Sequence, residues 1–204
     1  GLADMLIADL ASAPGVRVVE REKLEALKGE LALQQTGAMD ATSAQKLGKP
    51  LPDALIFHTI TETLLALDYA HKLIDKDSAR PLDIVHRDVS PHNVMLGFDG
   101  GVKLIDFGLA THVLKREFTR PGIMVGKLRY NAPEQVRDRA LDGRSDLYSV
   151  GCVAYYLLTG TLVFSDSNPM TVALKHVQAM PEPPSTRTEL PIPHELEQIV
   201  RNCL

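Results

Sequence analysis

Two carboxylates and one amide stand at a spacing that suits phosphoryl transfer. Asp88 and Asn93 lie five residues apart in the segment HRDVSPHN, and Asp106 follows Asn93 by thirteen residues. A carboxylate can orient a hydroxyl and take its proton late in the reaction, when no strong base is needed. Amide and carboxylate oxygens are hard ligands that suit Mg²⁺. The pattern therefore predicts Asp88 as a base, and Asn93 and Asp106 as ligands that hold Mg²⁺ against ATP.

These residues resemble the catalytic core of eukaryotic-type protein Ser/Thr kinases. In its detail the sequence resembles the bacterial members of that family. The likeness runs from residue 49 to residue 204 and includes DIVHRDVSPHNVML, the triplet APE and RSDLYSVGCVAYYLLTG. It implies a kinase large lobe that transfers the ATP γ-phosphate to Ser or Thr of a protein substrate, with ATP and Mg²⁺ as cofactors. It also implies that Met95 lies beneath the adenine ring, with an ordinary core position as the alternative.

The sequence departs from the family pattern in the positive charge beside the catalytic aspartate. Ser90 stands where most Ser/Thr kinases have lysine, and Lys127 stands where they have threonine before the APE motif. The resemblance implies that these two positions lie close together, so we infer an exchange in which Lys127 supplies the charge. Such a charge stabilises the transferring phosphate in the transition state. A solvated loop lysine is the alternative.

Further residues concern regulation and support of the catalytic loop. Arg87 precedes the catalytic aspartate, which resembles kinases activated by phosphorylation of the segment that ends at the APE motif. Thr119 is the best-placed acceptor there, with Thr111 as its rival. A phosphate on Thr119 would pair with Arg87. Asp146, at the start of an apolar helix, matches the aspartate that braces the catalytic-loop backbone.

Helices are expected to position most of these residues. Apolar residues at helical spacing, with capping residues at the ends, predict four helices, over residues 53–73, 145–159, 168–180 and 193–204. Two short strands, 94–96 and 102–105, flank the Asp99-Gly100 turn and read as a hairpin. The fold class is therefore α+β and mainly helical, and the catalytic loop lies between the first helix and the hairpin.

The first 48 residues have a different character. Their helix–strand–helix pattern, and above all the run RVVEREKLEAL, is similar to the opening of CsgG/TolB-type periplasmic lipoprotein domains. Any amphipathic α/β piece is the alternative, and neither interpretation assigns chemistry to the segment. We expect two parts: residues 1–48 as a short α/β segment, and residues 49–204 as a truncated kinase large lobe.

No small lobe that would cover ATP is recognisable in the sequence. Before residue 52 there is no G-x-G-x-x-G match, and the lysines there do not fit a V-A-I-K strand. Both ends of the chain look cut. Because one lost electrostatic donor costs about 10²–10³ in rate, we expect this chain to be inactive or weak. The alternatives are a non-catalytic module that binds a protein partner at the face of the missing lobe, and a gene fragment.

Composition bounds the remaining classes of function. The 204 residues carry a formal net charge of -4, with a pI of about 6.0, so no electrostatic footprint for nucleic acid exists. No apolar run reaches the roughly 18 residues of a membrane segment, and no signal pattern opens the chain. Cys152 and Cys203 lack the close partners of a metal or redox motif. We therefore expect reduced thiols in a cytoplasmic protein.

Overall fold

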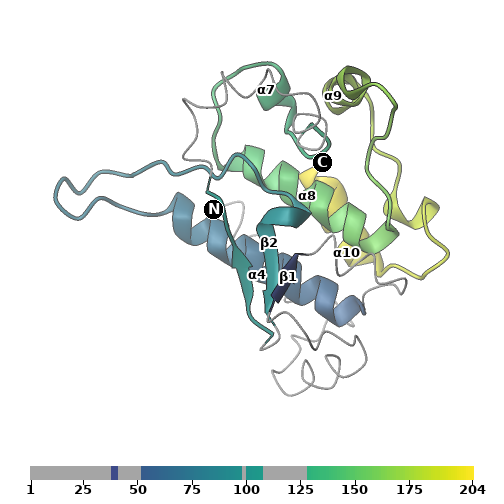
Figure 1. The fold of residues 1–204 in the computed structure, drawn as a ribbon, viewed down its shortest axis with the longest axis horizontal. Helices are drawn as coiled ribbons and strands as arrows, with labels where there is room; N and C mark the ends of the chain where they lie inside the picture. Colours follow the sequence, from purple (N-terminus) through teal and green to yellow (C-terminus); the bar gives the residue numbers. More distant parts are fainter. Residues whose placement is uncertain (1–37, 41–51, 98–99, 108–127) are drawn as a thin grey trace.

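The computed structural model describes residues 38–40, 52–97, 100–107 and 128–204. Helices make up about half of this part, and a small antiparallel sheet lies beside them (Figure 1), which is consistent with the expected α+β, mainly helical class. The elements are, in chain order, β1 (Ala38–Asp40), α4 (Asp53–His71), the 3-10 turn η1 (Pro91–Asn93), β2 (Val94–Gly97), β3 (Val102–Leu104), α7 (Pro133–Val136), α8 (Gly143–Thr159), α9 (Pro169–Gln178), the 3-10 turn η2 (Pro184–Thr186) and α10 (His194–Cys203).

The sheet has three strands in the order β1-β2-β3, and both pairings are antiparallel. Strands β2 and β3 form the predicted hairpin, with Leu96 opposite Val102. Gly100 has a φ of 82°, a left-handed conformation that glycine takes without a steric penalty. Strand β1 was not predicted. It pairs Met39 with Leu96 and so places part of the opening segment against the hairpin.

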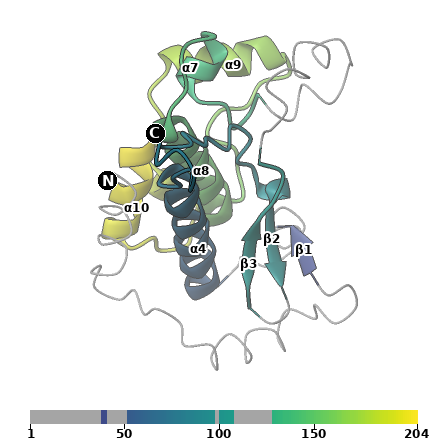
Figure 2. The ribbon, with the colours of Figure 1, turned by 90° about the vertical axis from the view of Figure 1, so that its left-hand side faces the viewer.

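Helices α4 and α8 pack together and make the centre of the core. Figure 2 shows the sheet on one side of this pair and α10 on the other. Helix α4 ends at His71, two residues before the predicted end. Its inner face buries the apolar residues that the helical spacing predicted, Ile56, Ile60, Leu64, Leu67 and Ala70. Burying a large aliphatic side chain stabilises the fold by about 1.5–3 kcal/mol relative to leaving it exposed.

Helix α8 is a buried support for the neighbouring loops. The side chain of Asp142 accepts a hydrogen bond from the N–H of Arg144 and caps its start, and Gly160 ends it with a φ of 69°, as predicted. At Gly151 a Cβ would lie 2.6 Å from the Cβ of Cys203, so the glycine permits the close approach of α10. Close packing on both sides therefore holds α8, and with it every side chain that α8 carries inward.

Helix α9 begins as the sequence predicts, because the side chain of Asn168 accepts a hydrogen bond from the N–H of Met170 and Pro169 is the first helical residue.

Both cysteines are free thiols, and burial raises the pKa of Cys152 and of Cys203 above the usual value. Within the described residues, no helix has both the length and the apolar character needed to cross a membrane.

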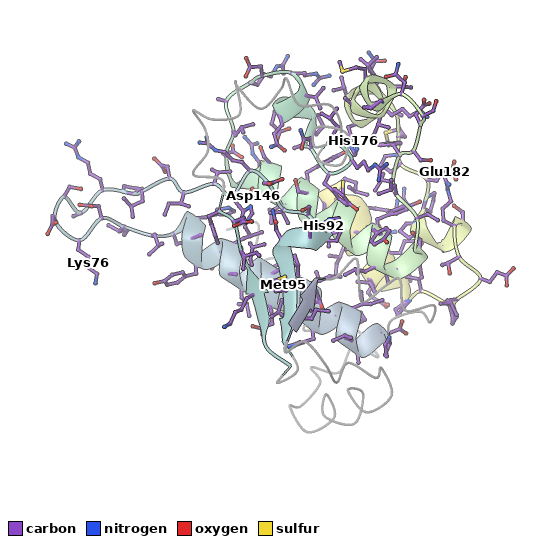
Figure 3. The ribbon with its side chains drawn as sticks, viewed as in Figure 1. Lys76, His92, Met95, Asp146, His176 and Glu182 are labelled. Atoms are coloured by element: carbon purple, nitrogen blue, oxygen red, sulfur yellow. The ribbon has the colours of Figure 1, made fainter. Side chains whose placement is uncertain are left out.

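Residues 72–83, here called the projecting loop, extend away from the end of α4 (Figure 1), and Lys76 marks the outer part of the loop in Figure 3. An isolated antiparallel bridge joins Ile74 to Pro81. The carboxylate of Asp75 accepts a hydrogen bond from the N–H of Ser78 at 2.7 Å. The hydrogen bonds that shape this loop thus lie largely within it.

Candidate functional site

Residues 86–93, here called the catalytic loop, lie before β2 and carry the candidate base and one candidate metal ligand. Asp88 lies on this loop, and η1 closes it at Asn93. The side-chain Nδ2 of Asn93 donates a hydrogen bond to the carbonyl of Asp88 at 2.7 Å, and the backbone N–H of Asn93 donates to the carbonyl of Ser90 at 2.9 Å. The two functional candidates therefore belong to one closed turn, although five residues separate them.

Strand β3 brings the third candidate, Asp106, to the same place. The N–H of Ile105 donates to the carbonyl of Asn93 at 2.9 Å. This bond holds Asp106, the next residue, close to the other candidate ligand. Asp106 is exposed, whereas Asn93 is buried. Because Nδ2 of Asn93 is already engaged with Asp88, its amide oxygen is the atom left for a cation.

An amide oxygen and an exposed carboxylate fit Mg²⁺, which takes few protein ligands and completes its shell with phosphate oxygens and water. Among the described residues no group of three or more His, Cys, Asp or Glu side chains could hold a metal ion. Phosphate oxygens of a nucleotide would complete the shell of a Mg²⁺ ion held by Asn93 and Asp106.

One buried carboxylate holds the backbone of the catalytic loop. Asp146, at the start of α8, is 1% exposed and accepts hydrogen bonds from the N–H groups of His86 and Arg87, both at 2.8 Å. His71 Nε2 donates to the same carboxylate at 2.8 Å. A buried charge needs such partners because it loses its hydration. The predicted bracing role of Asp146 (labelled in Figure 3) is confirmed.

The ring of His86 links the catalytic loop to Ile105, the residue that follows β3. Nδ1 accepts a hydrogen bond from the N–H of Asp88 at 3.2 Å, which assigns the proton to Nε2, and Nε2 donates to the carbonyl of Ile105 at 3.0 Å. The ring of Phe107 lies 4.5 Å away, centroid to centroid. Burial lowers the pKa of His86 below its usual value. A neutral histidine therefore connects the residue before Asp106 with the amide of Asp88.

Two residues of the site have left-handed backbone conformations without being glycine. Arg87 has a φ of 68° and Asp106 a φ of 58°. Each such residue costs about 1–3 kcal/mol and persists only where its surroundings fix the backbone. The hydrogen bonds of Asp146 to His86 and Arg87, and of Asn93 to Ile105, supply that fixation. Such conformations concentrate at active sites, which supports a functional role for this region.

Of the remaining predicted site residues, three lie in the part of the chain that the structure describes and two lie outside it. Ser90 is half-buried with an extended backbone before η1, and Met95 is half-buried on β2 (Figure 3). Arg87 is also half-buried, and its Nε is a buried atom with no hydrogen-bond partner among the described residues. Lys127 and Thr119 lie outside the described residues, so their predicted roles stay predictions.

Two supporting side chains were not predicted from the sequence. His71 reaches Asp146 across a separation of 75 residues, which no local pattern indicates. The second is Gln135, the third residue of α7. Its Nε2 donates to the carbonyl of Arg87 at 2.8 Å, and its Oε1 accepts from the N–H of Ala132 at 2.8 Å. The only local signal for Gln135 is its place three residues after the start of a helix, where glutamine commonly caps.

Comparison with known proteins decides the family. The model of the protein kinase domain matches residues 26–204. The chain belongs to the protein kinase family. Serine/threonine-protein kinase PknB of Mycobacterium leprae is 35% identical over 156 residues, which are 76% of this chain and 24% of that protein. PknB of Mycobacterium tuberculosis is 36% identical over 142 residues, 69% of this chain and 21% of that protein. These relatives confirm the predicted resemblance to bacterial eukaryotic-like Ser/Thr kinases.

Another relative carries a different name. Tyrosine-protein kinase MasK of Myxococcus xanthus is 36% identical over 156 residues, 76% of this chain and 23% of that protein. The kinase chain described above thus spans only 21% to 24% of the length of these three relatives.

The comparisons give no support to the CsgG/TolB-type resemblance of residues 1–48. The kinase match begins at residue 26 and so covers part of that segment. Strand β1, which pairs with β2, lies within the matched part. The division of the chain at residue 48 stays a prediction.

Proposed function

We propose that this chain supplies the large-lobe half of a site that transfers the ATP γ-phosphate to Ser or Thr hydroxyls of a protein. The observation that carries the proposal is the junction of the three candidate groups. Asn93 bonds the carbonyl of Asp88 through its side chain and the N–H of Ile105, next to Asp106, through its own carbonyl. One base and two oxygen ligands are thereby held on a single hydrogen-bonded frame.

In the proposed reaction Asp88 orients the acceptor hydroxyl and takes its proton as the new P–O bond forms. Asn93 and Asp106 would hold Mg²⁺, which when bound would offset the charge of the ATP phosphates. Met95, on the adjacent strand, would contact the adenine base. We favour Ser and Thr as acceptors because both PknB relatives are named Ser/Thr kinases. Phosphoamino-acid analysis of a labelled product tests this choice, and phosphotyrosine as the main product would overturn it.

The positive charge beside Asp88 comes from Lys127 in this proposal, because Ser90 cannot supply it. Replacing Lys127 with alanine should lower the rate of transfer by about 10²–10³, the usual effect of removing one donor that stabilises developing charge. Lys115→Ala, in the same segment of the sequence, is the matched control and should leave the rate nearly unchanged. Equal effects of the two substitutions would contradict the exchange.

Phosphorylation of Thr119 is proposed to switch the site on through Arg87. The support is the buried Nε of Arg87, which has no hydrogen-bond partner among the described residues. A phosphate oxygen is a strong acceptor for such a group. Mass spectrometry of the protein after incubation with Mg·ATP should find phosphate on Thr119, and Thr119→Ala should lower transfer to other substrates. Phosphate on Thr111 alone would assign the role to the rival.

Turnover by the 204-residue chain alone is expected to be weak. Residues 1–51 contain no G-x-G-x-x-G segment to cover the phosphates, and water exclusion and phosphate contacts supply much of the rate in kinases.

The first test is a thermal melt of this chain with and without Mg·ATP, with Asp106→Asn as the control. A Tm raised by Mg·ATP in the wild type alone is the expected result, and single-turnover transfer of labelled phosphate at high protein concentration follows it. A cooperative transition whose Tm is the same with and without Mg·ATP would overturn the proposed site.

A further inference from the structure

The side chain of Gln135 joins two parts of the molecule that meet beside the candidate base. Gln135 lies at the third position of α7, and its Oε1 accepts the N–H of Ala132 at 2.8 Å. Its Nε2 donates to the carbonyl of Arg87 at 2.8 Å, across 48 residues of sequence. The side chain thus uses one end on its own helix and the other on the catalytic loop.

Helix capping alone explains only the first of these bonds. An acceptor at the third helical position that reaches back to the capping residue is a common arrangement, and glutamate serves it as well as glutamine does. Near a helix N-terminus a negative charge is even favoured. A carboxylate cannot donate to a carbonyl, however, whereas the amide of Gln135 can. The bond to Arg87 is therefore the feature that requires glutamine.

That bond holds the peptide group that leads into Asp88. The carbonyl of this peptide belongs to Arg87 and accepts from Gln135, while its N–H belongs to Asp88 and donates to Nδ1 of His86. Arg87 has a φ of 68°, so this peptide is held in a conformation that the residue avoids when unconstrained. Asp146 binds the two N–H groups before it. Gln135 completes the fixation from the opposite, carbonyl side of Arg87.

The other end of Gln135 rests on a segment that α8 holds firmly. Ser149 of α8 donates to the carbonyl of Tyr130 at 2.8 Å, and Ser145 donates to the carboxylate of Glu134. Ala132 and Tyr130 are both buried. The backbone around Ala132 is thereby fixed on α8 from both sides, so it is a rigid anchor for the amide of Gln135.

We propose that Gln135 is a positioning residue for Asp88: its amide ties the Arg87–Asp88 peptide to the start of α7. The inference rests on the proposed function in so far as it concerns Asp88 as the base. Its consequence is that the geometry of the base depends on the seating of residues 128–135. A disturbance of that segment reaches Asp88 through the side chain of Gln135.

The test is Gln135→Glu in the full 204-residue chain, because the carboxylate can still cap α7 but cannot donate to the carbonyl of Arg87. The change also adds a negative charge, which the control variant reproduces. Gln178→Glu, at an exposed position of α9, is the matched control. Hydrogen exchange followed by mass spectrometry should show residues 86–90 exchanging about tenfold faster in Gln135→Glu. The Tm should fall by less than about 3 °C. The control should change neither quantity.

Single-turnover transfer gives a second readout that a purely structural role would not produce. Gln135→Glu should lower the rate about tenfold to a hundredfold while the apparent Kd for Mg·ATP changes by less than about twofold. The ratio of wild-type to variant rate should narrow toward pH 5, because a protonated carboxyl can again donate to the carbonyl of Arg87.

Unchanged exchange at residues 86–90 in Gln135→Glu would overturn the inference. Faster exchange throughout α4 and α8 would do so too, since it would reduce Gln135 to a general stabiliser. Absence of transfer by the wild type would count against the proposed function instead, and the exchange data would still decide the role of Gln135.

Discussion

The catalytic loop and the projecting loop both contain non-glycine residues with left-handed backbones, yet they are held in different ways. In the catalytic loop, Arg87 is fixed by Asp146 from α8 and by Gln135 from α7. In the projecting loop, Ala79 has a φ of 55°, and its N–H bonds to the carbonyl of Asp75 within the same loop. The first conformation depends on tertiary structure, and the second is maintained locally.

This difference teaches where the lobe can support a precise site. A loop held by buried groups from several helices opens only when those helices separate, so its geometry is as stable as the core. A loop held by its own exposed bonds opens alone at little cost. Asp88 lies on the first kind of loop, which suits a group that must stay within hydrogen-bond reach of its substrate.

The largest effect is expected from Asp146→Asn. The amide presents N–H donors to a place where three donors converge, so at least one buried N–H loses its acceptor. We expect a loss of about 2–4 kcal/mol in the free energy of unfolding and a Tm lower by about 5–10 °C. Asp77→Asn, at an exposed position of the projecting loop, should shift the Tm by less than about 1 °C. Similar shifts of the Tm from both substitutions would contradict the proposed difference between the two loops.

Acid should affect the buried core, including His86 of the catalytic loop, and the projecting loop in different pH windows. Burial lowers the pKa of His86 below 6.5, and it lowers the pKa of His176 to about 4. The unfolded chain therefore binds more protons than the native lobe once the pH falls below 6.5, so stability is lost from there toward pH 4. Thermal melts from pH 7.5 to pH 4 should show this decline in Tm.

The projecting loop should respond only at lower pH. Hydrogen bonds from Ser78 lower the pKa of Asp75 below 3.8, so its contribution is present above that value and is lost as the pH falls through the lowered pKa. NMR signals of residues 75–79 should therefore keep their native positions while the Tm already falls. Asp75→Asn is the control that removes this step. Loss of those signals near pH 6 would show that the two loops are coupled.

The smallest effect is expected from Ala79→Gly. Glycine relieves the steric cost of the left-handed conformation, about 1–2 kcal/mol, but gains freedom in the unfolded chain that offsets about half of it. A Tm equal to or up to about 2 °C above wild type is therefore expected. Ala140→Gly, another exposed alanine but without a positive φ, should lower the Tm slightly. A loss at Ala79 as large as that at Ala140 would contradict the local strain.

Local chemistry explains the parts of the fold that were predictable. The hairpin around Gly100, the cap at Asn168 and the end of α8 at Gly160 each follow from the conformations those residue types prefer. The inner face of α4 follows from its apolar spacing. Strand β1 was missed because three residues carry too little pattern to reveal a partner nearly 60 residues away.

The sequence by itself determined which groups could do chemistry: the base candidate Asp88, the ligand candidates Asn93 and Asp106, and the kinase family that their motifs indicate. Residue type and spacing suffice for that, because ligand and acid–base chemistry reside in single side chains. Only the tertiary structure decided how the loop is held. His71 and Gln135 act through hydrogen bonds to backbone and carboxylate atoms distant in sequence. Such bonds depend on how α4, α7 and α8 pack together, and no local sequence pattern encodes that packing.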